Sequence, residues 1–339
     1  MKPSLGRSND TPVLTTLLVV VCTLFSYITT LEARTADPIR AGIAVANITP
    51  EVGYPQYRGA STGVLDSLRA KTLVLEQNGV RTAFVVCDLI SIERELSVVA
   101  RSQAAEETGI PFEHIFVSGT HTHTGPSYHD EIEEYIERLR SDQLTDDDEH
   151  SYPAHLIDQI VQSIVDADED LQPVTLEDGI GEAHGISFNR RFLMTDGTVA
   201  FNPGVENPDI VRPMSPIDPA VQTMLIRTAD EGRAVAALTV FANHLDTTGG
   251  TEFSGDYPYY LAESLKEEFG DDFVSIFGTG PCGDINHIDV SSEPSPTTEE
   301  IGRTLASTVK NETPTLSEVN PALAVRSPTI LAPLQQYTE

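Results

Sequence analysis

Two stretches of the sequence repeat the same order of secondary-structure signals, and this order constrains the fold more than any other feature. Each stretch has two strand-like runs around a short turn, then a helical pattern, then a short apolar strand. The first, residues 73–117, turns at Asn-Gly, the favoured two-residue hairpin turn. The second, residues 224–277, turns at Asp-Glu-Gly. Hairpins combined with crossover helices predict an α/β fold with mixed β-sheets and flanking helices, and the repeat suggests an internal duplication.

Helical periodicity and capping signals place the remaining elements. The predicted helices cover residues 92–99, 130–140, 156–164 and 257–269, with a last one opened by a capping box at Thr297 and Glu300. The acidic run 146–149 is predicted to be a solvated loop, with a Ca²⁺ contact as the alternative. Residues 311–339 hold four prolines and no predicted element. The domain is therefore predicted to be incomplete at its carboxyl end.

The amino terminus has the pattern of a secretory signal peptide. Basic residues precede an apolar run at 13–27, and small residues follow near Ala33 and Ala36. Serine and threonine dilute the run, which is short for a bilayer span, so a membrane anchor is the less favoured alternative. We predict a signal peptide over 1–36, a catalytic domain over 37–339, a secreted or periplasmic location, and no stable membrane span after cleavage.

The charge of the chain excludes some partners. The sequence has 52 acidic and 21 basic residues and a formal net charge of −31. Nucleic acid is an unlikely partner for this surface, because phosphate binding requires basic side chains. An acidic surface also matches anionic membranes poorly. The oligomeric state does not follow from the sequence.

The cysteines do not form a disulfide framework. Three are present, and removal of a signal peptide would leave only Cys87 and Cys282. One bridge between them is possible, but two buried free thiols are the favoured interpretation. The fold must therefore depend on its apolar core.

A Thr-His-Thr-His-Thr-Gly-Pro run at residues 120–126 directly follows a predicted buried strand. On an extended backbone, residues two apart face the same way, so His121 and His123 could both reach one metal ion or one substrate. The alternative is a pair of surface loop histidines. The position after a strand, where open α/β sheets bind ligands, favours the functional interpretation.

A third histidine, His244, follows the strand predicted to end near Phe241. It is a candidate metal ligand, and Asp246 is placed to contact a metal or to orient a ligand. Viewed alone, His244 is better explained as a strand-end histidine that is hydrogen-bonded to a carbonyl.

Two further segments carry polar groups that chemistry could use. The Gly-rich loop 280–287 contains Asp284 and Asn286, and the Asn286 amide could donate to an oxyanion. One of the two adjacent arginines, Arg190 or Arg191, could hold a carboxylate or a polar head group. The alternatives are an ordinary turn for the loop and a surface ion pair for the arginine.

Several of these motifs stand in an order that resembles a known family. They are Ala41-Gly42-Ile43-Ala44, Asn47-Ile48-Thr49-Pro50, the run at 120–126, Asn189-Arg190, Asn243-His244, Ser254-Gly255-Asp256 and Gly283-Asp284. From about Ala41 to His287 the chain resembles the amino-terminal catalytic region of the neutral/alkaline non-lysosomal ceramidases. The ordered set is much more specific than any one member.

The resemblance implies a Zn²⁺-dependent amidase that splits the fatty acyl amide of ceramide. It implies that His121 and His244 bind zinc, that His123 faces the substrate, and that Arg190 contacts the substrate or transition state. Two features depart from the family. Asn286 stands where the family has a serine, and no Pro-Gly-Glu segment or late tyrosine supplies the remaining metal ligands. Catalytic zinc usually has three protein ligands and a water molecule.

The sequence therefore predicts a secreted, zinc-dependent, ceramidase-like hydrolase acting on a lipid-like amide of the N-acyl sphingoid type. In this hypothesis His123 relays a proton, while Asp284 and Asp246 orient the ligands. One alternative is a non-catalytic secreted binding domain that keeps the fold. The other is a metal-dependent esterase, lactonase or carbohydrate hydrolase.

Overall fold

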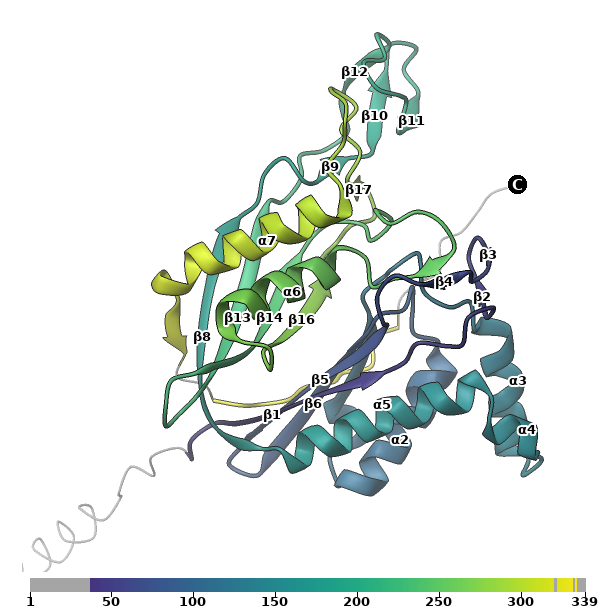
Figure 1. Ribbon diagram of the computed structural model, residues 1–339, viewed down its shortest axis with the longest axis vertical. Coiled ribbons are helices and arrows are strands. Elements are labelled where there is room, and N and C mark those ends of the chain that lie inside the picture. Colours follow the sequence, from purple (N-terminus) through teal and green to yellow (C-terminus); the bar gives the residue numbers. More distant parts are fainter. Residues whose placement is uncertain (1–36, 320–321, 332, 334–339) are drawn as a thin grey trace, which may run out of the picture. The chain divides into compact units, whose positions relative to one another are not determined.

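The nine-stranded sheet of the protein consists of two halves with the same topology (Figure 1). The computed structural model describes residues 37–319, 322–331 and 333 of the 339-residue chain. The predicted signal peptide, residues 1–36, lies outside the described residues. One half contains β1 (Arg40–Asn47), β5 (Arg69–Gln77), β6 (Val80–Cys87) and β7 (Ile115–Gly119). The other contains β8 (Gln172–Glu182), β13 (Ala220–Thr228), β14 (Ala234–Phe241) and β16 (Val274–Thr279).

Each half follows the order strand, hairpin, helix, strand, helix. The hairpin strands pair antiparallel, and the last strand joins parallel, β7 beside β6 and β16 beside β14. The crossover helices are α2 (Arg94–Thr108) and α6 (Tyr257–Phe269), and the closing helices are α5 (Tyr152–Glu169) and α7 (Thr298–Glu312). The predicted mixed α/β fold is confirmed, and the repeated topology supports the predicted duplication.

The two halves meet at a short junction and then face each other. β1 pairs with β8 through only two residue pairs, Arg40 with Pro173 and Ala41 with Gln172. Beyond that junction, alternate side chains of both halves form one shared apolar cluster, which includes Leu73 and Leu75 from the first half and Ile226 and Ile276 from the second.

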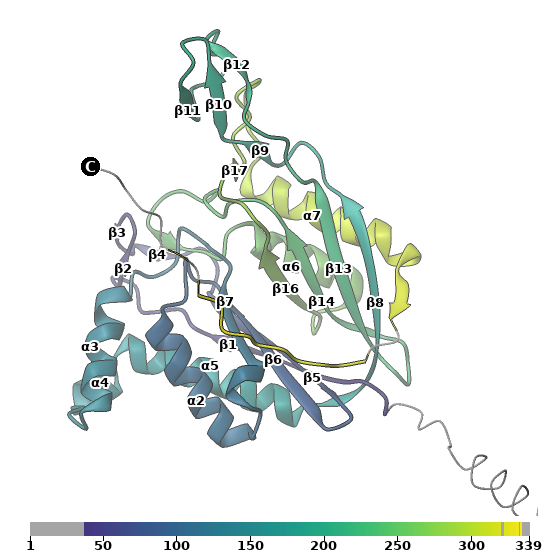
Figure 2. The same cartoon turned by 180° about the vertical axis from the view of Figure 1, so that it is seen from behind.

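The outer faces of the halves pack under separate sets of helices, as Figures 1 and 2 show. Helices α2, α3 (His129–Arg140) and α5 cover the first half, and α6 and α7 cover the second. The sheet region therefore has four layers, in the order helix, sheet, sheet and helix, and the strand ends that precede the histidines lie at one edge.

Local signals explain most of these elements. Asn78 and Gly79 both adopt positive φ, 52° and 78°, as the tight β5–β6 turn requires. The predicted capping box is confirmed: the Thr297 hydroxyl accepts from Glu300 N, and the Glu300 carboxylate accepts from Thr297 N. Pro258 lies in the first turn of α6, where its missing N–H costs nothing.

Two predictions about secondary structure are wrong. The acidic run 146–149 is not a loop but one helical turn, α4 (Asp146–Glu149), because Thr145 caps it and Arg138 pairs with Asp148 at 2.7 Å. The carboxyl-terminal segment does contain an element, β18 (Ser317–Val319). It pairs with β8 at residues 176–178, a stretch of the β8 edge that β1 leaves open.

The expectation about the cysteines holds in part. Cys87 and Cys282 are both free thiols, but only Cys87 is buried. In the part of the chain that the structure describes, no helix is long and apolar enough to cross a bilayer.

Smaller sheets surround the open edge of the main sheet. The pairs are β2 (Pro55–Gln56) with β3 (Gly59–Ala60), β4 (Gly63–Val64) with β15 (Glu252–Phe253), and β9 (Phe188–Asn189) with β17 (Ile285–Asn286). A three-stranded hairpin unit, β10 (Arg191–Met194), β11 (Val199–Phe201) and β12 (Ile210–Pro213), projects beyond β9 and β17 (Figure 2). Single 3₁₀ turns lie at Phe112–His114 and Thr313–Thr315.

Candidate metal centre

The loops after β7, β14 and β16 lie together at one edge of the sheet. A parallel bridge joins Thr122 to Leu245, and His123 N donates to Leu245 O at 2.9 Å. Thr279 Oγ1 at the end of β16 donates to Thr120 O at 2.5 Å. The chain thus brings residues from both halves of the sheet to one place, as expected for the carboxyl ends of parallel strands.

Three histidines meet at this edge. The ligand atoms of His121, His123 and His244 all lie within 4.8 Å of one another, and the Nε2 atoms of His121 and His244 are 3.2 Å apart. His244 is buried and the other two are half-buried. The proximity of His121 and His244 that the sequence predicted is present, although the two residues are separated by 123 positions.

The backbone fixes the orientation of two of these rings. His121 Nδ1 lies 2.7 Å from Ile90 O, and His244 Nδ1 lies 3.2 Å from Cys282 O. Because a carbonyl oxygen only accepts hydrogen bonds, each Nδ1 carries the proton and each Nε2 presents a lone pair. His121 also adopts a φ of 72°, a left-handed conformation that is uncommon for a residue with a side chain.

The environment favours neutral imidazoles. Burial, together with repulsion of the charged form by the adjacent His121 and His244, lowers the pKa of His123 to about 4. Burial also lowers the pKa of His244. Both rings are therefore uncharged near pH 7, which is the form that binds metal ions.

The residues present fit a divalent metal ion. Two nitrogens bound to one tetrahedral zinc at about 2.0–2.1 Å lie about 3.3 Å apart, close to the separation found between the Nε2 atoms of His121 and His244. His123 Nε2 is buried and has no hydrogen-bond partner within the described residues. Imidazole nitrogen suits zinc and also copper, iron and nickel, so the donor set indicates the kind of ion but not its identity.

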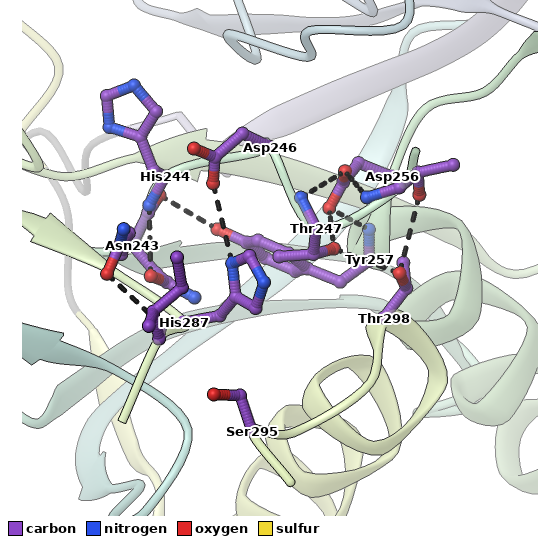
Figure 3. A network of polar contacts seen from close by, with 12 residues as sticks. Asn243, His244, Asp246, Thr247, Asp256, Tyr257, His287, Ser295 and Thr298 are labelled. Carbon is purple, nitrogen blue, oxygen red and sulfur yellow. Dashed lines mark hydrogen bonds and ion pairs between the residues drawn. The ribbon is translucent and has the colours of Figure 1, made fainter. Parts of the chain in front are cut away.

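A polar network holds the segment that carries His244 (Figure 3). Asp256 begins α6 and accepts from Thr247 N at 3.0 Å, Thr248 N at 2.9 Å and Tyr257 N at 2.8 Å. The Tyr257 hydroxyl donates to Asn243 O at 3.1 Å. These contacts fix both ends of the loop between β14 and α6, and so fix the histidine within it.

Asp246 lies in the same loop and pairs with His287 across a distance of 3.5 Å (Figure 3). Burial opposes ionisation of Asp246, but the contact with His287 and the nearby His244 outweigh it and keep its pKa below the usual range. This contact joins Asp246 to His287 and not to one of the three clustered histidines. The predicted role of Asp246 in orienting a metal ligand therefore remains a prediction.

The Gly-rich loop reaches the histidines through its backbone. Arg190 Nη2 donates to Gly283 O at 2.9 Å, and its guanidinium lies 4.8 Å from the centre of the Phe201 ring. Asp284 accepts from Asn189 Nδ2 and Ser215 Oγ, both at 2.8 Å, and no histidine contact is recorded for its carboxylate in the described chain. Asp284 therefore helps to hold the β9–β17 pair, and its predicted role in orienting a metal ligand remains a prediction. The Asn286 amide nitrogen is buried without a partner in the same set of residues.

Comparison with known proteins decides the family. The family model described as neutral/alkaline non-lysosomal ceramidase, N-terminal, matches residues 41–312. The chain belongs to this ceramidase family. The match covers both halves of the sheet, all three histidines and the Gly-rich loop, and it confirms the resemblance found in the sequence.

Individual ceramidases are similar to large parts of the chain. Neutral ceramidase of Pseudomonas aeruginosa is 27% identical over 291 residues, which are 80% of this chain and 40% of that protein. Neutral ceramidase A of Dictyostelium discoideum is 28% identical over 255 residues, 72% of this chain and 33% of that protein. The chain thus spans less than half the length of these relatives.

Solved ceramidase structures share the fold. The crystal structure of neutral ceramidase from Pseudomonas aeruginosa superposes with a TM-score of 0.63 at 22% identity, covering 81% of this chain and 44% of that one. A ceramidase complexed with C2 gives the same TM-score at 23% identity, covering 81% and 43%.

The sequence analysis missed the residues that fasten the histidine loop of this ceramidase-family domain. Thr122 Oγ1 and Thr124 Oγ1 both donate to Ser254 O, at 2.8 and 3.0 Å. Asp66 accepts from Ser254 Oγ at 2.5 Å and Gly255 N at 2.7 Å. The alternation of threonine with histidine was the available signal, because side chains facing away from the histidines must find polar partners when buried.

Replacing Asp66 by asparagine is expected to change the pH dependence of stability. Burial is the main cause that raises the pKa of Asp66 from 3.8 to about 6. The folded carboxyl group then binds its proton more tightly than the unfolded one, so its stabilisation is complete at low pH and is lost as pH rises through about 6. The wild type should lose about 3 kcal/mol from this group between about pH 4 and about pH 7.

The measurement is urea unfolding of both proteins across that pH range. Asparagine does not titrate, so the difference in free energy of unfolding between wild type and Asp66→Asn should change by about 3 kcal/mol. Titrating groups that do not interact with Asp66 cancel in this difference. If the free energies of unfolding of the two proteins changed in parallel with pH, the pKa of Asp66 would not be raised in the folded protein.

Proposed function

We propose that this chain is the amino-terminal catalytic region of a secreted, zinc-dependent hydrolase that cleaves the amide bond of an N-acyl sphingoid-type lipid. The observation that carries the proposal is the pair of Nε2 atoms, 3.2 Å apart, that His121 and His244 present to each other in a chain of the ceramidase family. The signal-peptide pattern of the sequence supports secretion.

The histidines divide into two roles in this proposal. His121 and His244 would hold the zinc ion through Nε2, and bound zinc supplies Lewis acidity that polarises a carbonyl group. His123 is uncharged near pH 7 and its Nε2 is buried without a partner in the described chain, so it can accept a proton at that atom.

Donors on the neighbouring loops would bind the substrate. The Asn286 amide nitrogen is unpaired within the described residues and can donate to a carbonyl oxygen. This asparagine stands where the family has a serine, so its contribution is a hydrogen bond. The Arg190 guanidinium uses one side for Gly283 O and leaves further N–H groups for a polar head group.

The direct test is turnover of a short-chain fluorescent ceramide by the purified full chain. We expect turnover with added zinc, its loss after chelation and its return when zinc is restored. A panel of simple esters and lactones measured alongside identifies the bond that is cleaved. Binding of the lipid without turnover at any metal concentration would favour the non-catalytic alternative, and turnover that survives chelation would exclude the metal.

A further inference from the structure

An apolar recess lies at the base of the β10–β12 hairpin unit, beside the Gly-rich loop. Its volume is about 310 Å³. Its carbon surface comes from two phenylalanines, two prolines and two aliphatic residues: Phe188, Phe192, Pro213, Pro216, Ile217 and Val290. Phe192 and Val290 are the buried apolar residues of this lining.

Most polar groups that line the recess already have partners; the exception is the buried Ser187 Oγ, which has none within the described residues. Asn189 donates to Ser215 Oγ and Asp284 Oδ2, and its own Oδ1 accepts from Arg191 N. Asp289 accepts from Ser291 N and Ser291 Oγ. A charged or strongly hydrogen-bonding ligand would find few unused groups here, whereas a hydrocarbon would bury carbon against carbon.

Backbone pairing connects the recess to the histidine cluster. Phe188 and Asn189 of the recess pair with Asn286 and Ile285 of β17. Four residues before Asn286, Cys282 O contacts His244 Nδ1 at 3.2 Å. Four residues of extended chain span at most about 14 Å, and neighbouring strands lie about 5 Å apart, so Phe188 lies within about 20 Å of Cys282.

We propose that this recess binds one hydrocarbon chain of the amide lipid while its carbonyl group lies at the histidines. The proposal rests on the proposed function. The order of groups along the loop matches such an amphiphile: the histidines at one end, the unpaired Asn286 amide nitrogen next, and the carbon-lined recess at the other end.

The test is the chain-length dependence of binding. Straight-chain N-acyl amides with about 4 to about 12 acyl carbons are titrated into the full chain by calorimetry, below the concentrations at which they form micelles. Each buried CH₂ contributes about 0.8 kcal/mol, so affinity should rise about fourfold per carbon until the recess is full and then level off. The same amides are followed for hydrolysis in parallel.

Two matched variants locate the effect. Ile217→Asp places a charge in the recess and should remove most of the gain with chain length, while affinity for the shortest amide stays as in the wild type. Val211→Asp introduces the same charge at a residue of the hairpin unit that is 54% exposed and does not line the recess, and it should keep the wild-type dependence. Thermal unfolding of both variants checks that they are folded.

The possible outcomes test the recess proposal independently of the proposed hydrolase function. Affinity that does not vary with chain length, or that varies equally in wild type and Ile217→Asp, overturns the recess proposal even if hydrolysis is observed. The expected dependence without hydrolysis would support the recess and contradict the proposed function.

Discussion

Replacing His244 by alanine is expected to remove the metal from the protein and with it almost all activity. Its Nε2 is one of two that face each other 3.2 Å apart, and its other nitrogen is fixed by Cys282 O. Replacing a residue that only hydrogen-bonds to a metal ligand typically weakens metal binding about 10–100-fold. Replacing the ligand itself should therefore weaken metal binding about 100-fold or more. Turnover should fall about 1,000-fold or more, because the metal contributes several kcal/mol to the transition state.

The measurement is metal content after dialysis, together with turnover of a short-chain ceramide. His184→Ala is the matched control, because the His184 side chain is 68% exposed and pairs with the exposed Glu182. This control should keep both metal and activity. A His244→Ala protein that retains a full equivalent of tightly bound metal would exclude this residue from the centre.

His123→Ala distinguishes the two interpretations of the paired histidines. If His123 faces the substrate, as the family resemblance implies, the variant keeps its metal and loses turnover. If it is a third ligand, as the common cluster of three rings allows, metal content falls as well. Both quantities are measured on the same samples as for His244.

Replacing Gly42 by alanine is expected to destabilise the fold by about 3 kcal/mol or more. Gly42 lies on β1 where α5 crosses it, and a Cβ at this position would lie 1.8 Å from Ala167 O and 2.9 Å from the carbonyl carbon. Those atoms belong to the helix backbone, so the helix must move away from the strand. Overpacking of this kind typically costs about 1–3 kcal/mol, and more where backbone must shift.

Urea unfolding gives the free energy of unfolding for this comparison. Gly249→Ala is the control, since Gly249 is exposed, has ordinary φ and has no atom within 4 Å of an added Cβ. The control should differ from the wild type by no more than about 0.5 kcal/mol. Similar free energies for both variants would show that α5 does not pack against β1 at this distance.

The hairpins and helices were predictable because their signals are local. Asn78-Gly79 sets the first hairpin turn and Thr297 with Glu300 sets the start of α7, and each acts within a few residues. The pairing of β1 with β8 and of β18 with β8 depends on partners far along the chain. No short sequence pattern carries that information, and the four-layer arrangement was therefore not predicted.

The sequence predicts only those parts of the candidate site that directly follow the ends of predicted strands. His121 and His244 follow strands whose carboxyl ends meet, so their proximity could be inferred from the sequence. The partners of Asp284 could not, because Asn189 and Ser215 reach it from an irregular segment with weak strand signals. Asp66 was missed because its contact with Ser254 joins residues that are 188 positions apart in the sequence.

The short β1–β8 junction has a thermodynamic consequence for the centre. His121 belongs to one half of the sheet and His244 to the other, and only two residue pairs join the halves along their shared strands. An ion held by both imidazoles would cross-link the halves, so its affinity and the free energy of their association are linked quantities. A substitution that loosens the inner apolar cluster enough to populate separated halves should therefore weaken ion binding.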